Sequence, residues 1–561
     1  MSKFIIYQVL PRLFGNYNTT NKQNGTIEEN GSGKFNSFTT KALSEIKSLG
    51  ITHIWYTGII EHATQTDYSA YGISKDHPGV VKGKAGSAYA IKDYYDVDPD
   101  LAENVENRMG EFENLVKRTH KADMQVIIDF VPNHVARQYH SDAKPAGVDD
   151  LGEKDHTEWA FSPLNNFYYL PKKPFLPKFD VQGYTESPAK ATGNDQFTAS
   201  PTRNDWYETV KLNYGVNYVE GGLKQFDPIP DTWIKMRDIL MFWASKKVDG
   251  FRCDMAEMVP VEFWGWAVSQ VKVQYPEIIF IAEVYNPAKY RNYIANGKFD
   301  YLYDKVGMYD MLRNVTSKNF PVREITNSWQ SLGGIENQML NFLENHDEQR
   351  ISSGFFSGNG MFAQPAMIVS ATLTQAPVMI YCGQELNELG MDTEGFSGLD
   401  GRTTIFDYWG VKSIQAWANG GKFDGKKLTP EQKELRAFYQ KLLHITLTEK
   451  AITDGLMYDL EFANYDNSKF NSHEQYAYFR KFEDELLLIV LNFHDKDLDT
   501  TVQFPLEAFQ YLDLEEGNRY SCVNLLDENE TLSSISLSSK QIFHTQMQAW
   551  RGKILKLIQV K

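Results

Sequence analysis

The feature that most constrains the fold is the alternation of short apolar runs with helical segments along most of the chain. Eight runs have the length and flanking turn residues of buried strands: 4–10, 52–56, 124–131, 248–254, 278–283, 299–303, 339–347 and 376–382. Helical spacing follows or separates them at 39–49, 111–120, 230–245, from 261 and at 430–446, where Thr429 predicts an N-cap. This alternation predicts an α/β fold, a (β/α)8 TIM barrel.

Two stretches depart from the alternation. Residues 135–218 are rich in Pro, Gly, Asn, Asp and aromatics and lack a sustained period, so we expect a small inserted domain after the third strand. From residue 450 the chain turns to short alternating runs that are typical of an all-β sandwich domain. The predicted domains are a catalytic barrel at 1–134 and 219–449, an insert at 135–218 and a C-terminal β-sandwich at 450–561.

Composition restricts the partners of the chain. The formal net charge of −16 disfavours nucleic acid and anionic membranes but is compatible with a neutral ligand. The three cysteines have no clustered spacing, so neither a disulfide framework nor a zinc site is expected. No stretch approaches the roughly 20 apolar residues of a membrane span, and a strand-like run follows the first residues directly, which predicts a cytoplasmic protein. The oligomeric state is left open.

Three of the strand-like runs end on a carboxylate: Asp254, Glu283 and Asp347. A single Asp at a strand end often only caps the next helix, but three at the carboxyl edge of a barrel suggest a reaction centre. Arg252 shares a strand face with Asp254, so its charge is expected to lower the pKa of that carboxylate, as suits a nucleophile. Glu283 follows apolar residues, which should raise its pKa and suit a proton donor.

Two histidines at strand ends add possible hydrogen-bond donors for hydroxyl groups. His134 follows Asn133, and His346 follows Asn345. A lone histidine is more often a satisfied core residue, but the second pair directly precedes Asp347 and so favours a functional site.

These segments resemble the ordered signature of the α-amylase superfamily, glycoside hydrolase family 13. The resemblance rests on residues 129–134, 250–254, 281–284 and 342–347, with supporting segments at 50–55, 89–95 and 377–385. It implies a retaining mechanism in which Asp254 is the nucleophile, Glu283 the acid/base and Asp347 the transition-state stabiliser. It also implies substrate binding by a stacking tyrosine and three polar residues: Tyr89, His134, Arg252 and His346. Arg350, three residues after Asp347, is a further substrate-binding candidate, with pairing to a pocket carboxylate and a solvated surface position both left open.

The resemblance leaves the metal and the exact substrate open. Calcium, which family members often hold between barrel and insert, would depend here on Asn133, Asn213 and the carbonyl of Met258, and no organic cofactor is implied. The chain has Glu257 and Met258 where many family amylases carry Lys-His, which removes a familiar sugar contact. Pocket depth should be set by the insert and by residues 387–409.

The implied reaction is hydrolysis of α-1,4-glucosidic bonds in starch-like glucans or maltooligosaccharides. One alternative is a transglycosylase that passes the glycosyl unit to another sugar. A second is a glucan-binding protein without catalysis, although such proteins typically lose members of the carboxylate triad, which this chain keeps.

Overall fold

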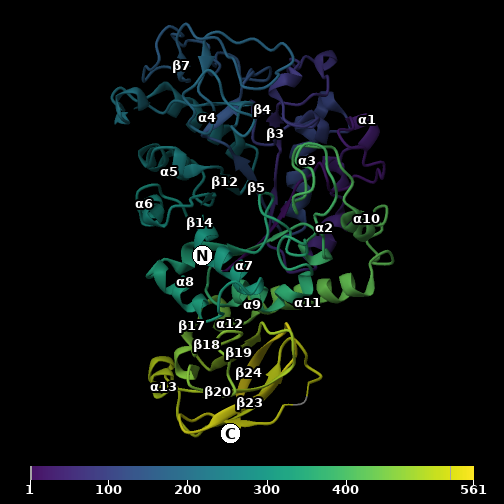
Figure 1. The fold of residues 1–561 in the computed structure, drawn as a ribbon, viewed down its shortest axis with the longest axis vertical. Helices are drawn as coiled ribbons and strands as arrows, with labels where there is room; N and C mark the ends of the chain where they lie inside the picture. The colour runs from purple at the N-terminus through teal and green to yellow at the C-terminus, as the bar shows by residue number, and fades with distance from the viewer. Residues whose placement is uncertain (1–2, 531, 561) are drawn as a thin grey trace.

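Eight parallel strands close into a barrel, as the alternating sequence predicts (Figure 1). The computed structural model describes residues 3–530 and 532–560. The order around the barrel is β1-β16-β15-β14-β13-β12-β5-β2. These strands are β1 (Ile5–Val9), β2 (His53–Tyr56), β5 (Gln125–Phe130), β12 (Gly250–Cys253), β13 (Ile279–Ala282), β14 (Tyr301–Tyr303), β15 (Met339–Phe342) and β16 (Val378–Tyr381).

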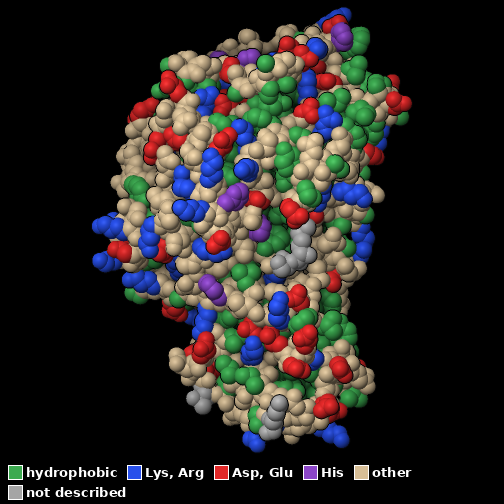
Figure 2. Space-filling model, turned by 180° about the vertical axis from the view of Figure 1, so that it is seen from behind, with side chains coloured by type: hydrophobic (Ala, Val, Ile, Leu, Met, Phe, Trp, Pro, Cys, Tyr) green, Lys and Arg blue, Asp and Glu red, His purple; other side chains and the backbone are tan. Residues whose placement is uncertain are grey.

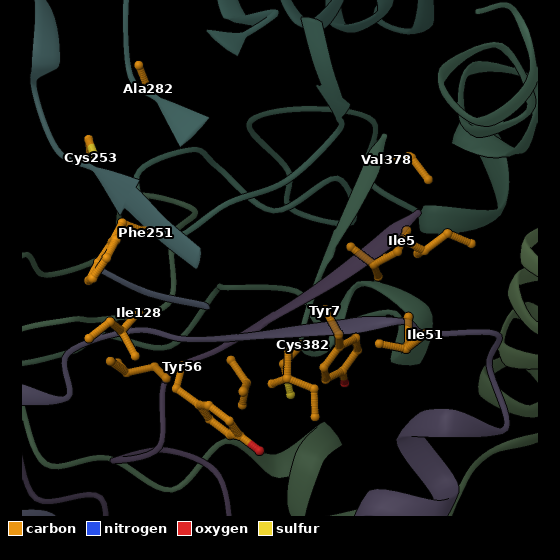
Figure 3. Close-up of a cluster of buried hydrophobic side chains, with 14 of the residues drawn as sticks. Ile5, Tyr7, Ile51, Tyr56, Ile128, Phe251, Cys253, Ala282, Val378 and Cys382 are labelled. Carbon is orange, nitrogen blue, oxygen red and sulfur yellow. The ribbon is translucent and has the colours of Figure 1, made fainter. Parts of the chain in front are cut away.

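The strands are largely apolar because both of their faces are buried. In β1, Ile5 and Tyr7 point to the helix layer, where they pack in the cluster of Figure 3, while Ile6 packs inside the barrel with Ile127 and Ile281. A barrel strand therefore reads as a continuous apolar run instead of an alternating one.

Helices cover the outside of the barrel. Those predicted from spacing are α2 (Thr40–Lys47), α3 (Arg108–Lys121), α4 (Asp231–Ser245), α5 (Val261–Gln274) and α11 (Pro430–Thr448). The N-cap prediction for α11 is confirmed, since the Thr429 side chain accepts from the backbone N–H of Gln432. Shorter helices lie between the later strands, namely α6 (Tyr290–Ala295), α7 (Asp310–Thr316), α8 (Glu324–Leu332) and α9 (Gln364–Thr372), and α10 (Lys412–Ala418) follows β16.

The segment after β5 extends from the barrel end opposite the C-terminal domain (Figure 1). It holds short strands: β6 (His134–Ala136), β7 (Tyr169–Leu170), β8 (Ala189–Lys190) and β9 (Thr209–Lys211). Antiparallel pairing of β6 with β9 returns the chain to the barrel. The antiparallel pair β10 (Val216–Asn217) and β11 (Leu223–Lys224) spans residue 218, where we propose that the insert ends and the barrel resumes. An antiparallel pair not expected from sequence, β3 (Ile60–His62) and β4 (Ile91–Val97), follows β2.

The C-terminal domain is an antiparallel sandwich. A six-stranded sheet has the order β17 (Leu456–Asp459), β18 (Gln475–Phe482), β19 (Glu485–Asn492), β24 (Gly552–Gln559), β21 (Arg519–Asn524) and β22 (Ile535–Ser536). A second sheet pairs β20 (Leu498–Gln503) with β23 (Ile542–Met547), and apolar residues of both sheets share one core. Sequence reasoning missed the helices α12 (Lys450–Thr453) and α13 (Leu506–Leu512).

The surface carries charged side chains of both signs (Figure 2), and the three cysteines lie in the interior. Charged side chains of both signs are dispersed over the face shown in Figure 2, and the molecule narrows above the C-terminal domain. Cys253, Cys382 and Cys522 are buried free thiols. Within residues 3–530 and 532–560, every helix is too short or too polar to cross a bilayer.

Candidate active site

Asp254 and Glu283 stand side by side at the carboxyl edge of the barrel. Each is the first residue after its strand, whereas the sequence predicted that each would be the last residue of its strand. The strands β12 and β13 are direct neighbours, with Cys253 opposite Ala282. Their backbone N–H groups continue the ladder, donating to the carbonyls of Phe130 (2.9 Å) and Cys253 (3.1 Å). Strand pairing therefore fixes both carboxylates at one rim.

Arg252 is a buried guanidinium that joins these two carboxylates. Its two terminal nitrogens lie 2.7 Å from Asp254 Oδ1 and 2.9 Å from Glu283 Oε2, and its Nε donates to the Tyr303 hydroxyl at 3.1 Å. It also lies 3.5 Å from Asp129 Oδ1. The side chain thus contacts both carboxylates, whereas the sequence suggested a partner for Asp254 alone.

The expected lowering of the Asp254 pKa is wrong. Burial raises the pKa of Asp254 well above its ordinary value, more than Arg252 lowers it, and the charge of Glu283 raises it further. The buried guanidinium therefore does not offset the cost of burying the Asp254 carboxylate.

Two donors fix the orientation of Glu283. The hydroxyl of Tyr285 donates to Oε1, and the backbone N–H of Met255 donates to Oε2 at 2.8 Å. Burial, with the charges of Glu283 and Asp347, raises the pKa of Tyr285 well above its ordinary value, so the phenol stays a neutral donor. Sequence reasoning missed this tyrosine, although it follows Glu283 by two residues.

Asp347 comes from a loop, not from a strand end. β15 ends at Phe342, and the Asn345 side chain accepts from the backbone N–H groups of Asp347 and Glu348, both at 2.9 Å, which folds the loop back. The Asp347 side chain keeps 44% of its surface exposed and lies 3.0 Å from His346 Nε2. Burial would raise the pKa of Asp347, but the charge and hydrogen bond of His346 lower it to about 2.

Aromatic and imidazole rings support the rest of the site. The Tyr89 ring stacks on His346 at 4.9 Å and 18°, and its hydroxyl donates to Asp129 Oδ1 at 3.3 Å. His134 is buried with its ring 5.1 Å from that of Trp206. Burial, followed by the charges of Lys211 and Lys82, lowers the pKa of His134 to about 3, so its imidazole is neutral.

A cavity of about 350 Å³ brings these groups together. It is lined by Lys82, Ser87, Tyr89, His134, Trp206, Glu208, Thr209, Asp254, Met255, Glu283, Tyr285, His346, Asp347, Ile405 and Phe406. The three carboxylates, Tyr89 and both histidines share it, while Arg252 lies behind the carboxylates.

The walls of this cavity come from the two segments expected to set its depth. Trp206, Glu208 and Thr209 belong to the insert, and Ile405 and Phe406 to the loop within 387–409. Sequence reasoning missed Lys82 and Glu208, a buried ion pair of 2.9 Å, because no motif marks either residue.

Arg350 is not part of the cavity. Its guanidinium is buried against Glu344 Oε2 at 2.8 Å, donates to Thr403 Oγ1 at 2.8 Å and lies over the Tyr381 ring. The predicted substrate contact is therefore wrong, because this arginine neutralises a buried carboxylate that holds the loop after β15.

The residues expected to hold calcium do not form a suitable donor set. Asn133 Oδ1 accepts from the Lys211 ammonium at 2.7 Å, and the Asn213 amide is engaged by the carbonyls of Ser162 and Asn165 and by the N–H of Gly215. Met258 ends a short 3₁₀ turn after β12 and shares no hydrogen bond with these asparagines among the described residues. Nor do the described residues include a cluster of three His, Cys, Asp or Glu that could bind a metal.

Comparisons with known proteins agree with this geometry. The family profile described as "Alpha amylase, catalytic domain" matches residues 8–442. Alpha-amylase 3 of Dictyoglomus thermophilum is 25% identical over 425 residues, covering 72% of this chain and 74% of that protein. An alpha-1,4-glucan:maltose-1-phosphate maltosyltransferase of Cereibacter sphaeroides is 25% identical over 207 residues, covering 36% and 26%.

A solved structure extends the likeness to the whole fold. The maltogenic alpha-amylase of Thermotoga neapolitana superimposes with a TM-score of 0.63 at 20% identity, covering 99% of this chain and 98% of that one. The chain therefore belongs to the α-amylase family of glycoside hydrolases.

Proposed function

We propose that the enzyme hydrolyses α-1,4-glucosidic bonds in starch-like glucans or maltooligosaccharides with retention of configuration. This proposal is supported by the binding of Asp254 and Glu283 to one buried guanidinium and by the cavity that both carboxylates line together with Asp347. A retaining glycosidase needs its two carboxyl groups about 5–5.5 Å apart, and a shared arginine favours such close placement.

In the first step, an oxygen of Asp254 attacks the anomeric carbon while Glu283 gives its proton to the departing glycosidic oxygen. The bond between the anomeric carbon and that oxygen breaks as the ester to Asp254 forms. In the second step, Glu283 takes a proton from water, which attacks the same carbon and releases Asp254. Asp347, ionised because His346 lowers its pKa, would stabilise the positive charge on the ring in both transition states.

The dimensions of the cavity support short substrates. About 350 Å³ lies near the lower end of the range for ligand pockets, roughly 300–1,000 Å³. Trp206 and Phe406 close it from two different segments and offer apolar faces for sugar rings. We therefore propose that maltooligosaccharides and chain ends are better substrates than the interior of long polymers.

Transglycosylation is the second candidate, because the same covalent intermediate can pass to a sugar instead of water. The maltosyltransferase relative gives this alternative support. A purely glucan-binding role is disfavoured, since all three carboxylates face the cavity.

A time course of products from amylose, pullulan and maltoheptaose tests these proposals. Hydrolysis predicts only products shorter than maltoheptaose, whereas longer products would assign the enzyme to transfer. The Asp254→Asn variant should fold normally and lose turnover. The control variant Asp499→Asn, changed at an exposed ion pair with Lys469 in the C-terminal domain, should keep normal turnover. Normal turnover by Asp254→Asn would overturn the assignment.

A further inference from the structure

A buried lysine occupies the junction between the barrel and the insert. Lys211 ends β9, opposite His134 in the antiparallel pair with β6. Its side chain is 2% exposed, and its ammonium lies 2.7 Å from Asn133 Oδ1 and 2.6 Å from Asp195 Oδ1. An ammonium with so little access to water depends on these two oxygens for its stabilisation.

The two partners come from different parts of the fold. Asn133 follows β5 of the barrel by three residues, and Asp195 lies in the insert. The Asn133 amide also donates to the carbonyl of Gly193 at 2.8 Å, so the loop at 193–195 is tied to the barrel twice. The lysine is therefore a cross-link between the two parts, made by charge and hydrogen bonds.

The oxygens that surround this ammonium are of the kind that calcium prefers. Ca²⁺ binds carboxylate, amide and carbonyl oxygens. Here one carboxylate and one side-chain amide converge on a position already filled by a fixed positive charge. Burial lowers the pKa of Lys211, and the charge and hydrogen bond of Asp195 act in the opposite direction.

We propose that the Lys211 ammonium is a built-in cation that replaces calcium at the junction between barrel and insert and positions His134 at the cavity. Asn133 immediately precedes His134, and its amide lies 3.1 Å from His134 Nδ1. The same insert supplies Trp206, Glu208 and Thr209 to the cavity wall. Lys211 is a positioning residue, since it acts through Asn133 and the insert, not on the substrate.

The test compares the full-length wild type with two variants and a control. Lys211→Met removes the charge, and Lys211→Asp replaces it with a shorter carboxylate, which leaves room for Ca²⁺ beside Asn133 and Asp195. Lys190→Met is the matched control, because Lys190 also lies in the insert but donates to the carbonyl of Arg137. Thermal midpoints are measured in EDTA, in CaCl2 and in MgCl2, and calcium binding by titration calorimetry.

We expect the thermal midpoint of the wild type to be the same in EDTA and CaCl2, and we expect calorimetry to detect no heat of calcium binding to the wild type. Both Lys211 variants should lose several degrees in EDTA, and Ca²⁺, but not Mg²⁺, should restore Lys211→Asp while leaving Lys211→Met unchanged. Lys190→Met should show no calcium response. Stoichiometric calcium binding that stabilises the wild type, or a Lys211→Met midpoint equal to that of the wild type, would overturn the proposal.

The activity readout depends on the proposed function, but the stability and calcium readouts do not. In EDTA, kcat/KM of Lys211→Asp should fall by about tenfold or more, because small displacements of a substrate-positioning group can cost up to about 10²-fold. Calcium should restore this loss. Recovery of the midpoint without recovery of kcat/KM would show that the lysine only holds the fold and would overturn its positioning role. An inactive wild type that still behaves as expected in stability would instead count against the proposed function alone.

Discussion

Removing the guanidinium of Arg252 should produce a pH-dependent loss of stability. The Arg252→Met variant leaves Asp254 and Glu283 buried without their shared cation. Breaking a buried ion pair by removing one partner costs about 3–5 kcal/mol when the remaining charge stays ionised. The carboxyl groups can avoid that cost by binding protons, and each unit of pKa shift corresponds to about 1.36 kcal/mol.

The sign of the pH dependence follows from linkage. Burial already raises the pKa of Asp254 in the folded state, and loss of Arg252 should raise it further, so the folded variant binds more protons than the unfolded chain above about pH 4. Its stability relative to the wild type should therefore be nearly normal at pH 4 and fall as the pH rises, toward a deficit of about 3–5 kcal/mol at pH 8. Catalytic activity should be lost at every pH.

The assay is urea unfolding of the barrel transition between pH 4 and pH 8. Arg480→Met in the C-terminal domain is the matched control. Arg480 is equally buried but donates only to carbonyls, those of Ala451, Leu373, Ile452 and Gly455. Its loss should destabilise the protein without pH dependence in this range. The same pH-independent deficit in Arg252→Met would refute the view that the carboxylate pair determines the effect.

Three further predictions concern the cavity. Lys82 lines the cavity, so we expect its ammonium to donate a hydrogen bond to a sugar hydroxyl, a contact worth about 1.5–3 kcal/mol. Lys82→Met should therefore raise KM for maltotriose about tenfold or more, whereas the neighbouring Lys84→Met should leave KM unchanged. Equal KM values for both variants would contradict this sugar contact. His346→Gln should raise the pKa of Asp347 from about 2, so the acidic limb of the pH profile of kcat/KM should move to higher pH. An acidic limb at the same pH as in the wild type would contradict the effect of His346 on Asp347. Asp347→Asn should lower kcat by about 10²–10³-fold with an unchanged circular dichroism spectrum; a smaller loss would argue against its electrostatic role.

The barrel could be predicted because its information is local. Each strand is an apolar run bounded by turn residues, and burial of both faces, as for Ile5 and Ile6 in β1, leaves that run uninterrupted. The position of Asp254 and Glu283 follows from the same pattern, since the residue after a barrel strand must lie at its carboxyl edge. For β12 and β13, the predicted carboxyl ends differ from the structure by one residue.

The errors arose where contacts between distant segments decide the outcome. Asp347 reads as a strand end because residues 339–347 begin with an apolar run, but Asn345 folds the loop back through its side chain. The environment of Arg350 depends on Glu344 and on Thr403, 53 residues away. Likewise, the partners of Asn133 include Lys211, 78 residues later, which no local pattern could indicate.

Trapping the covalent intermediate tests the central claim most directly. The enzyme is incubated with a fluorinated α-glucosyl fluoride that forms the ester quickly and hydrolyses slowly, and the digested protein is mapped by mass spectrometry. The retaining mechanism predicts one added glycosyl unit on the peptide that contains Asp254, and no adduct in the Asp254→Asn variant. A glycosyl unit on a different carboxylate, or release of the β-anomer as the first product from maltooligosaccharides, would contradict it.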